Sequence, residues 1–395
     1  MADPWLVLIG LGEDGLAGLP DASRAALADA QVIFGGPRHL ALVGAGDRGR
    51  PWPVPFDVAP VLAARGQRVV VLASGDPFWF GAGGSLARHL AAGEWVAHPA
   101  PSTFGWMAAR LGWRLEAVTC LGLHAAPLPR LRPHLAEGAR ILVLIAGPDA
   151  VAPLAGWLQG AGFGRSILHL CQAMGGADER IVTLTATDPL PTGLIAPLAL
   201  AIEARADHPG AGLPRSPGLA DDLFATDGQI TKAPMRALTL AALAPRAGER
   251  LWDLGAGSGS VSVEWCLAGG RAEAVERDPA RQAHIRANAQ AFGVDDRLTL
   301  HPGDHAALLD SLPAPQAVFV GGGGDAALFD RLLALPPGTR LVANAVTLET
   351  QVLVTDLHAR RGGRLMRVDL AEAGPLGRMR GWTHARGVVQ WAVVL

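Results

Sequence analysis

The chain has 395 residues, half of them apolar, and a formal net charge of −2 at pH 7. Its length exceeds that of one typical domain, so we expect two or three domains. The near-neutral charge argues against a nucleic-acid partner, and no apolar run approaches the ~18 residues needed to cross a membrane. The N-terminus lacks the basic flank of a signal peptide, and the three cysteines are too dispersed for a disulfide framework or a zinc site. We therefore expect a soluble cytoplasmic protein that needs no metal ion.

The first half contains two apolar strands that each run into a turn of small residues. The strands are expected at 5–9 and 68–73, and the turns that follow them begin Gly-Leu-Gly at residue 10 and Ser-Gly-Asp-Pro at residue 74. A third turn, 99–103, precedes a helix expected over 105–111. Each turn is a weak signal by itself, since Asp76 could simply cap a turn.

In this order and spacing, the turns closely resemble those of the tetrapyrrole (uroporphyrin-type) methylase family. The resemblance covers residues 4–204 and includes 171–181, which ends in Asp-Glu-Arg-Ile. It implies a bilobal α/β fold with parallel-dominated sheets and S-adenosylmethionine (SAM) bound in a cleft between the lobes. Gly12-Glu13-Asp14-Gly15 departs from the family's usual Gly-Pro-Gly-Asp, and Ser102-Thr103 departs from its Ser-Ser pair. The implied SAM contacts are Gly10, Gly12, Gly75, Asp76, Pro77, Ser102, Thr103, Ala146, Ala173 and Met174.

A segment without periodicity separates the two halves of the chain. Residues 203–217 contain several prolines and glycines, which is typical of a linker. We therefore expect a first domain over 1–204, a linker over 205–217 and a second domain over 218–395. A shorter stretch, 125–130, is expected to be a loop inside the first domain.

The second half opens with the most specific motif of the chain. An apolar strand at 251–254 runs into Gly255, Gly257 and Gly259, and a helix is expected from residue 260. Glycines allow the sharp turn and the close approach of a ligand to the backbone. A dinucleotide fingerprint would have its third glycine at Ser260, whereas Gly-x-Gly-x-Gly is typical of SAM methyltransferases. The expected cofactor contacts in this loop are Gly255, Ala256, Gly257, Ser258 and Gly259.

Three further strands end in polar or glycine residues. The strand 272–276 ends in Glu276, which can accept both ribose hydroxyls of a bound nucleoside unless it is a solvated surface acid. The strand 297–301 leads to Asp304 and His305, where this methyltransferase class usually contacts adenine, and 317–320 leads to four glycines. The carboxyl ends of parallel strands meet at one sheet edge, so these residues predict a SAM site there.

Two SAM-binding folds in succession resemble the fused precorrin C-5,15-methyltransferases (decarboxylating) of cobalamin biosynthesis. The segments 229–236, with Thr231 expected to close over SAM, and 343–350 are similar to that family. The resemblance implies C-5 methylation by the first domain, C-15 methylation and loss of the ring C acetate carboxyl by the second, two SAM sites, no metal, a tetrapyrrole substrate and a homo-oligomer. It also implies a C-terminal seven-stranded Rossmann-like sheet with an antiparallel last pair.

Two alternatives stay open. The substrate could be a cobalt-precorrin, or the second half could methylate RNA or protein while the first half is inactive. Base-methylating enzymes usually follow the fourth strand with Asn/Asp-Pro-Pro-aromatic, where this chain has 321–324, all glycine.

Candidate substrate contacts lie between two expected late strands, 364–370 and 388–394. The glycine-rich segment 374–387 is long for a hairpin, and long loops are often functional lids. Its arginines Arg378, Arg380 and Arg386 suit the substrate carboxylates, although they could be solvated. Arg380 and Glu349 are the candidate catalytic residues. Glu349 is assigned as an acid, with an N-terminal capping charge as the alternative.

Overall fold

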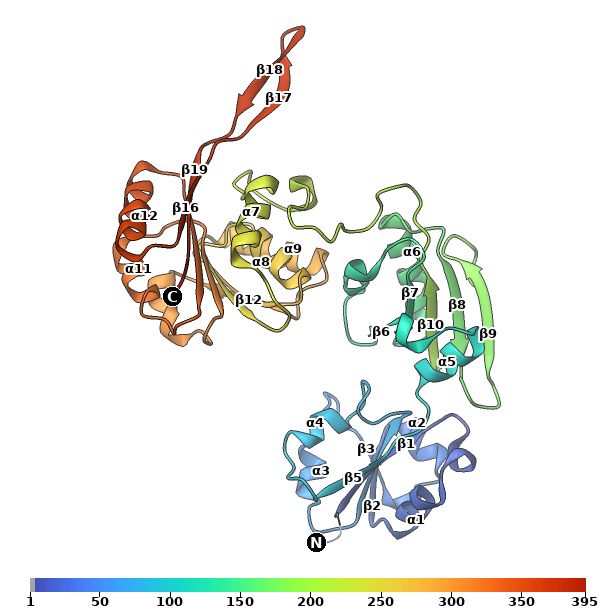
Figure 1. Cartoon of the computed structure of the whole chain (residues 1–395). Coiled ribbons are helices and arrows are strands. Elements are labelled where there is room, and N and C mark those ends of the chain that lie inside the picture. Colours follow the sequence, from blue (N-terminus) through green and yellow to red (C-terminus); the bar gives the residue numbers. More distant parts are fainter. Residues whose placement is uncertain (1–3) are drawn as a thin grey trace. The chain divides into compact units, whose positions relative to one another are not determined.

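The computed structural model describes residues 4–395 and consists of two compact units (Figure 1). Unit 1 ends at Gly212 and excludes the short segment Pro129–Pro133, which packs with Leu213–Leu395 as unit 2. The boundary thus falls inside the segment expected to be a linker. The first part of that segment is attached to unit 1, because the Asp207 carboxylate accepts hydrogen bonds of 2.9 Å from the backbone N–H groups of Gly164 and Arg165.

The first sheet of unit 1 is parallel throughout, in the order β3-β2-β4-β1-β5. Neighbouring residues on its central strands face opposite sides, so Leu8 packs in one apolar cluster and Ile9 in the other. Because both faces are covered, the strands are continuous apolar runs. The strands are β1 (Leu6–Leu11), β2 (Val32–Gly35), β3 (Gly49–Pro51), β4 (Val69–Ser74) and β5 (Trp95–His98), and the helices are η1 (Gly15–Gly18), α1 (Asp21–Asp29), α2 (Pro37–Leu42), η2 (Gly46–Arg48), α3 (Ala59–Ala63) and α4 (Gly83–Ala87).

The second sheet of unit 1 is mostly antiparallel, in the order β6-β7-β10-β8-β9. The β6–β7 pair is parallel and the other three pairs are antiparallel, so the expectation of parallel-dominated sheets is wrong here. The segment 173–179 joins β8 to β9 directly, and antiparallel strands need no long crossover. The elements are α5 (Thr103–Leu111), η3 (Leu115–Ala117), β6 (Thr119–Gly122), η4 (Leu128–His134), β7 (Arg140–Leu144), η5 (Pro148–Ala150), α6 (Val151–Gly160), β8 (Ile167–Gln172), β9 (Arg180–Thr185) and β10 (Leu198–Glu203). The stretch expected to be a loop at 125–130 is a 3₁₀ helix from Leu128 onward.

Unit 2 is built on the expected seven-stranded sheet, in the order β13-β12-β11-β14-β15-β19-β16. Five strands run parallel, and β19 is antiparallel to both of its neighbours, β15 and β16. The strands are β11 (Arg250–Leu254), β12 (Arg271–Glu276), β13 (Leu298–Pro302), β14 (Ala317–Val320), β15 (Arg340–Ala345), β16 (Arg364–Val368) and β19 (Val388–Val394).

Helices cover both faces of this sheet. Leu251 of β11 packs in the cluster that contains α7, α8 and α9, whereas the next residue, Trp252, packs in the cluster that contains α11 and α12. Period-two alternation within a fully buried strand produces this arrangement. The helices are η6 (Asp221–Leu223), α7 (Ala233–Leu243), α8 (Ser260–Leu267), α9 (Pro279–Ala291), α10 (His305–Leu308), η7 (Leu309–Ser311), α11 (Ala326–Leu332) and α12 (Leu348–Arg361).

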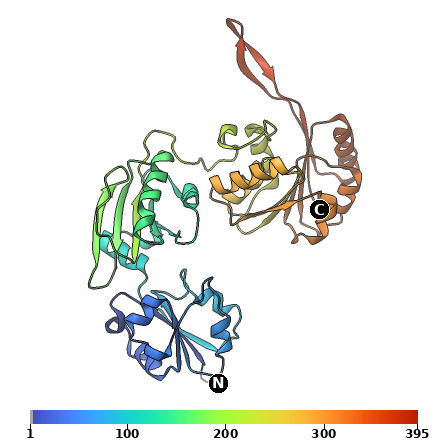
Figure 2. The same ribbon diagram turned by 180° about the vertical axis from the view of Figure 1, so that it is seen from behind.

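A two-stranded hairpin projects from unit 2 (Figure 2). It consists of β17 (Ala371–Leu376) and β18 (Met379–His384), paired along their whole length. The expectation of a loop over 374–387 is therefore wrong, because most of that segment is β-strand. The turn between the strands begins at Gly377, whose φ of +59° suits the first central position of a tight hairpin turn. The hairpin leaves the sheet where β16 ends and β19 begins, which is the edge where the parallel strands have their carboxyl ends.

Candidate active sites

The glycine loop of unit 2 is packed against the sheet at one end and open at the other. The backbone N–H groups of Gly255 and Ala256 both donate to the Val275 carbonyl, at 3.0 and 3.1 Å. A Cβ on Gly255 would lie 2.8 Å from the Gly322 carbonyl oxygen, so glycine is required there. Gly257 has a φ of +59°, and the nearest atom to a Cβ built on it is the Gln229 oxygen, 3.9 Å away. The loop thus leaves room for a ligand beside Gly257.

Glu276 ends β12 as a buried carboxylate that shapes this loop. Its Oε2 accepts from the Gly257 N–H at 2.8 Å, and its Oε1 accepts from the Asp278 N–H at 2.9 Å. Only 6% of the residue is exposed, so a solvated surface acid does not describe it. Each carboxylate oxygen has a second lone pair, which remains available to a ligand hydroxyl.

Asp253 is a further candidate site residue, which the sequence analysis missed. It is 1% exposed, and its Oδ2 accepts from the Ser262 hydroxyl at 2.6 Å. Its Oδ1 has no hydrogen-bond partner among residues 4–395. Burial raises the pKa of Asp253 to about 6, and the charge of Glu276 adds to this. An open acceptor on a buried acid indicates a donor from a ligand. Its position two residues before Gly255 was the signal that could have found it.

The ends of β13 and β14 meet beside the glycine loop. Asp304 caps α10, because its Oδ1 accepts from the Ala306 N–H at 2.8 Å. The Nε2 of His305 lies 3.2 Å from the Gly323 carbonyl oxygen, in the four-glycine run after β14. The strand-end residues predicted from the sequence therefore do gather at one edge of the sheet.

Three side chains from α7 and α9 fix the segment that carries Thr231, and one of them also binds the glycine loop. The Nδ2 of Asn288 donates to the carbonyls of Ser258 and Ala225, at 2.8 and 2.9 Å. Arg281 binds Asp227 and Gln229 of this segment. The fully buried Arg236 donates to the Thr231 carbonyl and pairs with Glu264 at 2.5 Å.

The candidate catalytic and substrate-binding residues are all exposed. Glu349 lies in the first turn of α12, where its own backbone N–H and the Thr347 hydroxyl lower its pKa. These contacts fit the alternative interpretation of Glu349, a charge that caps the N-terminus of the helix. Arg378 occupies the hairpin turn, Arg380 lies on β18, and Arg386 follows β18. Arg378 and Arg380 therefore lie at the tip of the hairpin, away from the sheet, whereas Arg386 lies at its base, at the sheet edge that carries the glycine loop (Figure 1).

In unit 1, three strand ends pack backbone against backbone. A Cβ on Gly10 would lie 1.8 Å from the Gly75 carbonyl oxygen, and a Cβ on Gly75 would lie 2.5 Å from the Ser102 Cα. The Gly75 N–H donates to Leu11, and its carbonyl accepts from Ala100. Packing alone thus requires glycine at positions 10 and 75.

The polar residues of these turns also have structural partners. Asp76 Oδ1 accepts from the Phe78 N–H at 2.8 Å, and the Ser102 hydroxyl accepts from the Gly105 N–H at 3.1 Å and caps α5. Asp76 is therefore a turn-capping aspartate, whatever else it contacts. A Cβ on Gly12 would lie 2.5 Å from the Asp14 side chain. Pro77 accepts a backbone hydrogen bond from Gly83, and Thr103 is the first residue of α5.

The remaining predicted contacts of unit 1 offer backbone rather than side-chain chemistry. Ala173 follows β8 with a φ of +43°, and its N–H donates to the Pro197 carbonyl. Met174 packs in the apolar cluster beneath α5, and Ala146 is exposed after β7.

A polar cluster at the ends of β2 and β4 was also missed. Arg38 pairs with Glu13 and donates to the Ser74 hydroxyl at 3.1 Å, and His39 Nε2 lies 2.9 Å from the same hydroxyl. Burial, with a smaller contribution from the Arg38 charge, lowers the pKa of His39 to about 4. His39 is therefore neutral at physiological pH. The Gly-Gly-Pro-Arg-His run after the apolar residues of β2 was the available signal.

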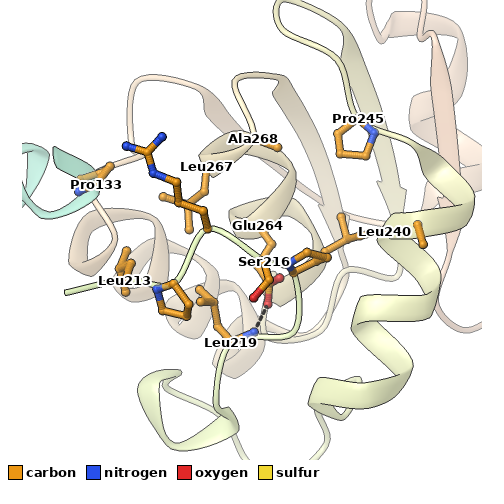
Figure 3. A pocket seen from close by; sticks show the side chains of 13 residues that line it. Pro133, Leu213, Ser216, Leu219, Leu240, Pro245, Glu264, Leu267 and Ala268 are labelled. Carbon is orange, nitrogen blue, oxygen red and sulfur yellow. Dashed lines mark hydrogen bonds between the residues drawn. The ribbon is translucent and has the colours of Figure 1, made fainter. Parts of the chain in front are cut away.

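A separate pocket of about 390 Å³ lies between α7, α8 and the start of unit 2 (Figure 3). Its lining includes Leu213, Leu240 and Glu264, and Glu264 accepts from the Leu219 N–H at 3.0 Å. The glycine-loop residues do not line it. Within residues 4–395, no three His, Cys, Asp or Glu side chains are grouped to hold a metal ion. Over the same range, every helix is too short or too polar to span a membrane.

Comparisons with known proteins match both halves of the chain. Residues 5–189 match the family of tetrapyrrole (corrin/porphyrin) methylases, and residues 222–395 match the precorrin methyltransferase domain. A precorrin-6Y C(5,15)-methyltransferase (decarboxylating) from Sinorhizobium sp. is 47% identical over 401 residues, which cover 99% of this chain and 97% of that protein.

Two shorter matches accompany it. A probable cobalt-precorrin-6B C(15)-methyltransferase (decarboxylating) from Pyrobaculum aerophilum is 39% identical over 149 residues, which cover 36% of this chain and 76% of that protein. The crystal structure of the C-terminal domain of precorrin-6Y C5,15-methyltransferase from Rhodobacter capsulatus is 58% identical. It covers 46% of this chain and 100% of that domain, with a TM-score of 0.46.

Proposed function

Because the chain belongs to the family of precorrin-6Y C(5,15)-methyltransferases (decarboxylating), we propose that its two units methylate one precorrin at different carbons. The enzyme is a decarboxylating methyltransferase of cobalamin biosynthesis, and methyltransferases of this family use SAM. Unit 1 is assigned to C-5. Unit 2 is assigned to C-15 and to removal of the ring C acetate carboxyl.

For unit 2, this proposal rests on Asp253, a buried carboxylate whose Oδ1 has no hydrogen-bond partner among residues 4–395. An anionic acceptor suits the cationic end of SAM, and the space beside Gly257 admits a ligand close to the backbone. We assign Glu276 to the ribose hydroxyls and the Asp304–His305 turn to the adenine. The segment with Thr231 closes the site. When bound, SAM supplies the methyl group.

In unit 1, we propose a second SAM site at the ends of β1, β4 and β5 and beside Ala146, Ala173 and Met174. Support for it is the convergence of Gly10, Gly75 and Ser102 in one backbone-to-backbone contact. The side chains of Asp76 and Ser102 already shape the turns, so we assign the contacts of this edge with SAM to the backbone.

The substrate itself supplies much of the reactivity. The meso carbons of a reduced precorrin are enamine-like nucleophiles, so the protein need not provide a strong base for attack on a methyl group. Its work is to align carbon, methyl and sulfur and to exclude water. We propose that Arg378, Arg380 and Arg386 meet the substrate carboxylates. The lowered pKa of Glu349 opposes its assignment as a proton donor, so we leave the acid unassigned.

We further propose a homo-oligomer whose contacts include the β17–β18 hairpin. Leu376, Met379 and Trp382 are exposed on it, Trp382 by 71%. Leu376 and Met379 are cross-strand partners on one face of the hairpin, and strand alternation puts Trp382 on the other face. A lone two-stranded hairpin is marginally stable in water, and large exposed apolar side chains are typical of an interface.

Calorimetric titration of the full chain with S-adenosylhomocysteine tests the two-site assignment. We expect two sites in the parent and one tight site in each of Glu276→Ala and Asp76→Ala. Loss of a charged hydrogen bond is worth ~1.5–3 kcal/mol, about tenfold or more in affinity. Glu276→Ala should impair C-15 methylation alone, and Asp76→Ala should impair C-5 methylation to a smaller extent. A single site in the parent would contradict the proposal and favour an inactive half.

A further inference from the structure

The loop after β4 carries three consecutive aromatic residues that remain partly in water. Phe78, Trp79 and Phe80 are 44%, 37% and 51% exposed. They follow the Gly75–Pro77 turn that we assign to SAM in unit 1. Several exposed aromatic rings grouped beside a ligand-binding edge are typical of a surface that binds a ligand, and are unusual in a loop that only connects two elements.

Hydrogen bonds hold the backbone of this loop in place. The Phe78 and Trp79 N–H groups donate to the side chain and carbonyl of Asp76, at 2.8 and 3.1 Å. The Gly83 N–H closes the loop onto the Pro77 carbonyl at 2.9 Å. A Cβ on Gly81 would lie 2.5 Å from that same carbonyl oxygen. The loop is therefore tightly built, and the rings are presented in a defined arrangement.

Phe80 is held in a strained conformation. Its φ is +58°, in the left-handed region that a bulky side chain rarely adopts. Burial does not compensate for this strain, since half of the side chain is exposed. Backbone strain of this kind clusters at functional sites.

Two neighbours define the position of the Trp79 and Phe80 rings. The ring centroids of Trp79 and Phe80 lie 5.1 and 5.9 Å from that of Phe104, a buried residue of α5. Gly122, at the end of β6, lies against Phe80, because a Cβ there would be 2.9 Å from the ring. Helix α5 begins beside Ser102 and Thr103, so the rings adjoin the proposed SAM contacts of unit 1.

We propose that Trp79 and Phe80, backed by Phe104, form an aromatic shelf against which one face of the tetrapyrrole macrocycle stacks during methylation by unit 1. A conjugated macrocycle has apolar π faces and carries its carboxylates on its rim. Offset stacking on rigid rings would therefore hold its face while leaving the rim to polar groups. The aromatic shelf depends on the proposed function of unit 1, and within that function Trp79 and Phe80 position the substrate.

The test compares Trp79→Leu and Phe80→Gly in the full chain with a matched control, Phe56→Leu. Phe56 is also an exposed aromatic residue of unit 1, packed 5.0 Å from Trp52 and outside the shelf. The probe is uroporphyrin, a stable conjugated tetrapyrrole with carboxylate arms, titrated by its absorption band. Each shelf variant should weaken the binding of one equivalent by about tenfold, and the control should bind as the parent does.

Thermal unfolding and S-adenosylhomocysteine binding separate this role from a structural one. Glycine adopts a φ of +58° without strain, so Phe80→Gly should melt within a few degrees of the parent or above it. Both shelf variants should still bind two equivalents of S-adenosylhomocysteine, and with precorrin substrate their product should lack one methyl group.

Three results would overturn the shelf but not the proposed function. In the first, the two variants bind uroporphyrin as the parent does. In the second, they lose one equivalent of S-adenosylhomocysteine, which would assign the rings to the adenosyl group. In the third, the parent binds S-adenosylhomocysteine at both sites but no uroporphyrin in unit 1. A parent that binds no S-adenosylhomocysteine would overturn the proposed function together with the shelf.

Discussion

Replacing Asp253 by Asn should change how the stability of unit 2 depends on pH. Burial raises the pKa of this carboxyl from 3.8 to about 6, so the folded state holds the proton more tightly than the unfolded state. Between these two pH values folding takes up a proton, and stability therefore falls as pH rises. The cost of the buried charge is absent below about pH 4 and complete above about pH 6.

The size of the effect follows from this pKa. A tenfold change in acid dissociation constant corresponds to ~1.36 kcal/mol, so the ionised Asp253 costs unit 2 about 3 kcal/mol at neutral pH. Asparagine carries no charge at any pH. The measured quantity is the melting temperature of Asp253→Asn minus that of the parent. At ~2–4 °C per kcal/mol, this difference should increase by about 6–12 °C between pH 4 and pH 7.

Scanning calorimetry of the full chain between pH 4 and pH 7 measures this difference. Any constant cost of the asparagine amide cancels, because only the change with pH is compared. Asp310→Asn is the control, since that side chain is 92% exposed and belongs to the same unit. If the melting-temperature difference of Asp253→Asn stays constant over this range, Asp253 is not the buried ionisable group described here.

Four further expectations concern other residues. Gly257→Leu should abolish SAM binding by unit 2, because its φ of +59° favours glycine and a leucine side chain would fill the space left for the ligand, and mass spectrometry should then find a product with one added methyl and the acetate retained. Arg236→Met should lower the free energy of unfolding by ~3–5 kcal/mol in urea denaturation, since it leaves the buried Glu264 carboxylate unpaired. Glu349→Gln should retain most decarboxylation in a carbon-dioxide release assay, because a carboxyl with a lowered pKa is a poor proton donor. Trp382→Ser should reduce the oligomer mass measured by light scattering, because it removes an exposed ring of the hairpin.

Each of these has a contradicting outcome. A Gly257→Leu product with two added methyls and no acetate carboxyl would move the SAM site elsewhere. Arg246→Met, whose side chain is 63% exposed, is the control for Arg236 and should leave stability nearly unchanged. Loss of carbon-dioxide release in Glu349→Gln would restore Glu349 as the acid. An unchanged mass for Trp382→Ser would remove the hairpin from the oligomer contact.

The sequence by itself determined the architecture of unit 2 and the gathering of its strand-end residues. Gly255 and Gly257 lie in the loop that follows β11, and Glu276 is the last residue of β12. Parallel strands that alternate with helices bring their carboxyl ends to one edge of a sheet. In such a fold, a residue at the end of a parallel strand can therefore be placed at that edge from the sequence. The glycine turns of unit 1 could be located from local signals for the same reason.

Only the tertiary structure decided what depends on neighbours distant in sequence. The second sheet of unit 1 is mostly antiparallel because β10 pairs between β7 and β8, which no local pattern encodes. The hairpin at 371–384 has too little apolar alternation to be distinguished from a loop. The open acceptor of Asp253 and the strain of Phe80 are likewise visible only in the fold. Burial, strand pairing and backbone strain depend on contacts between segments that are far apart in the sequence and meet only in the folded protein.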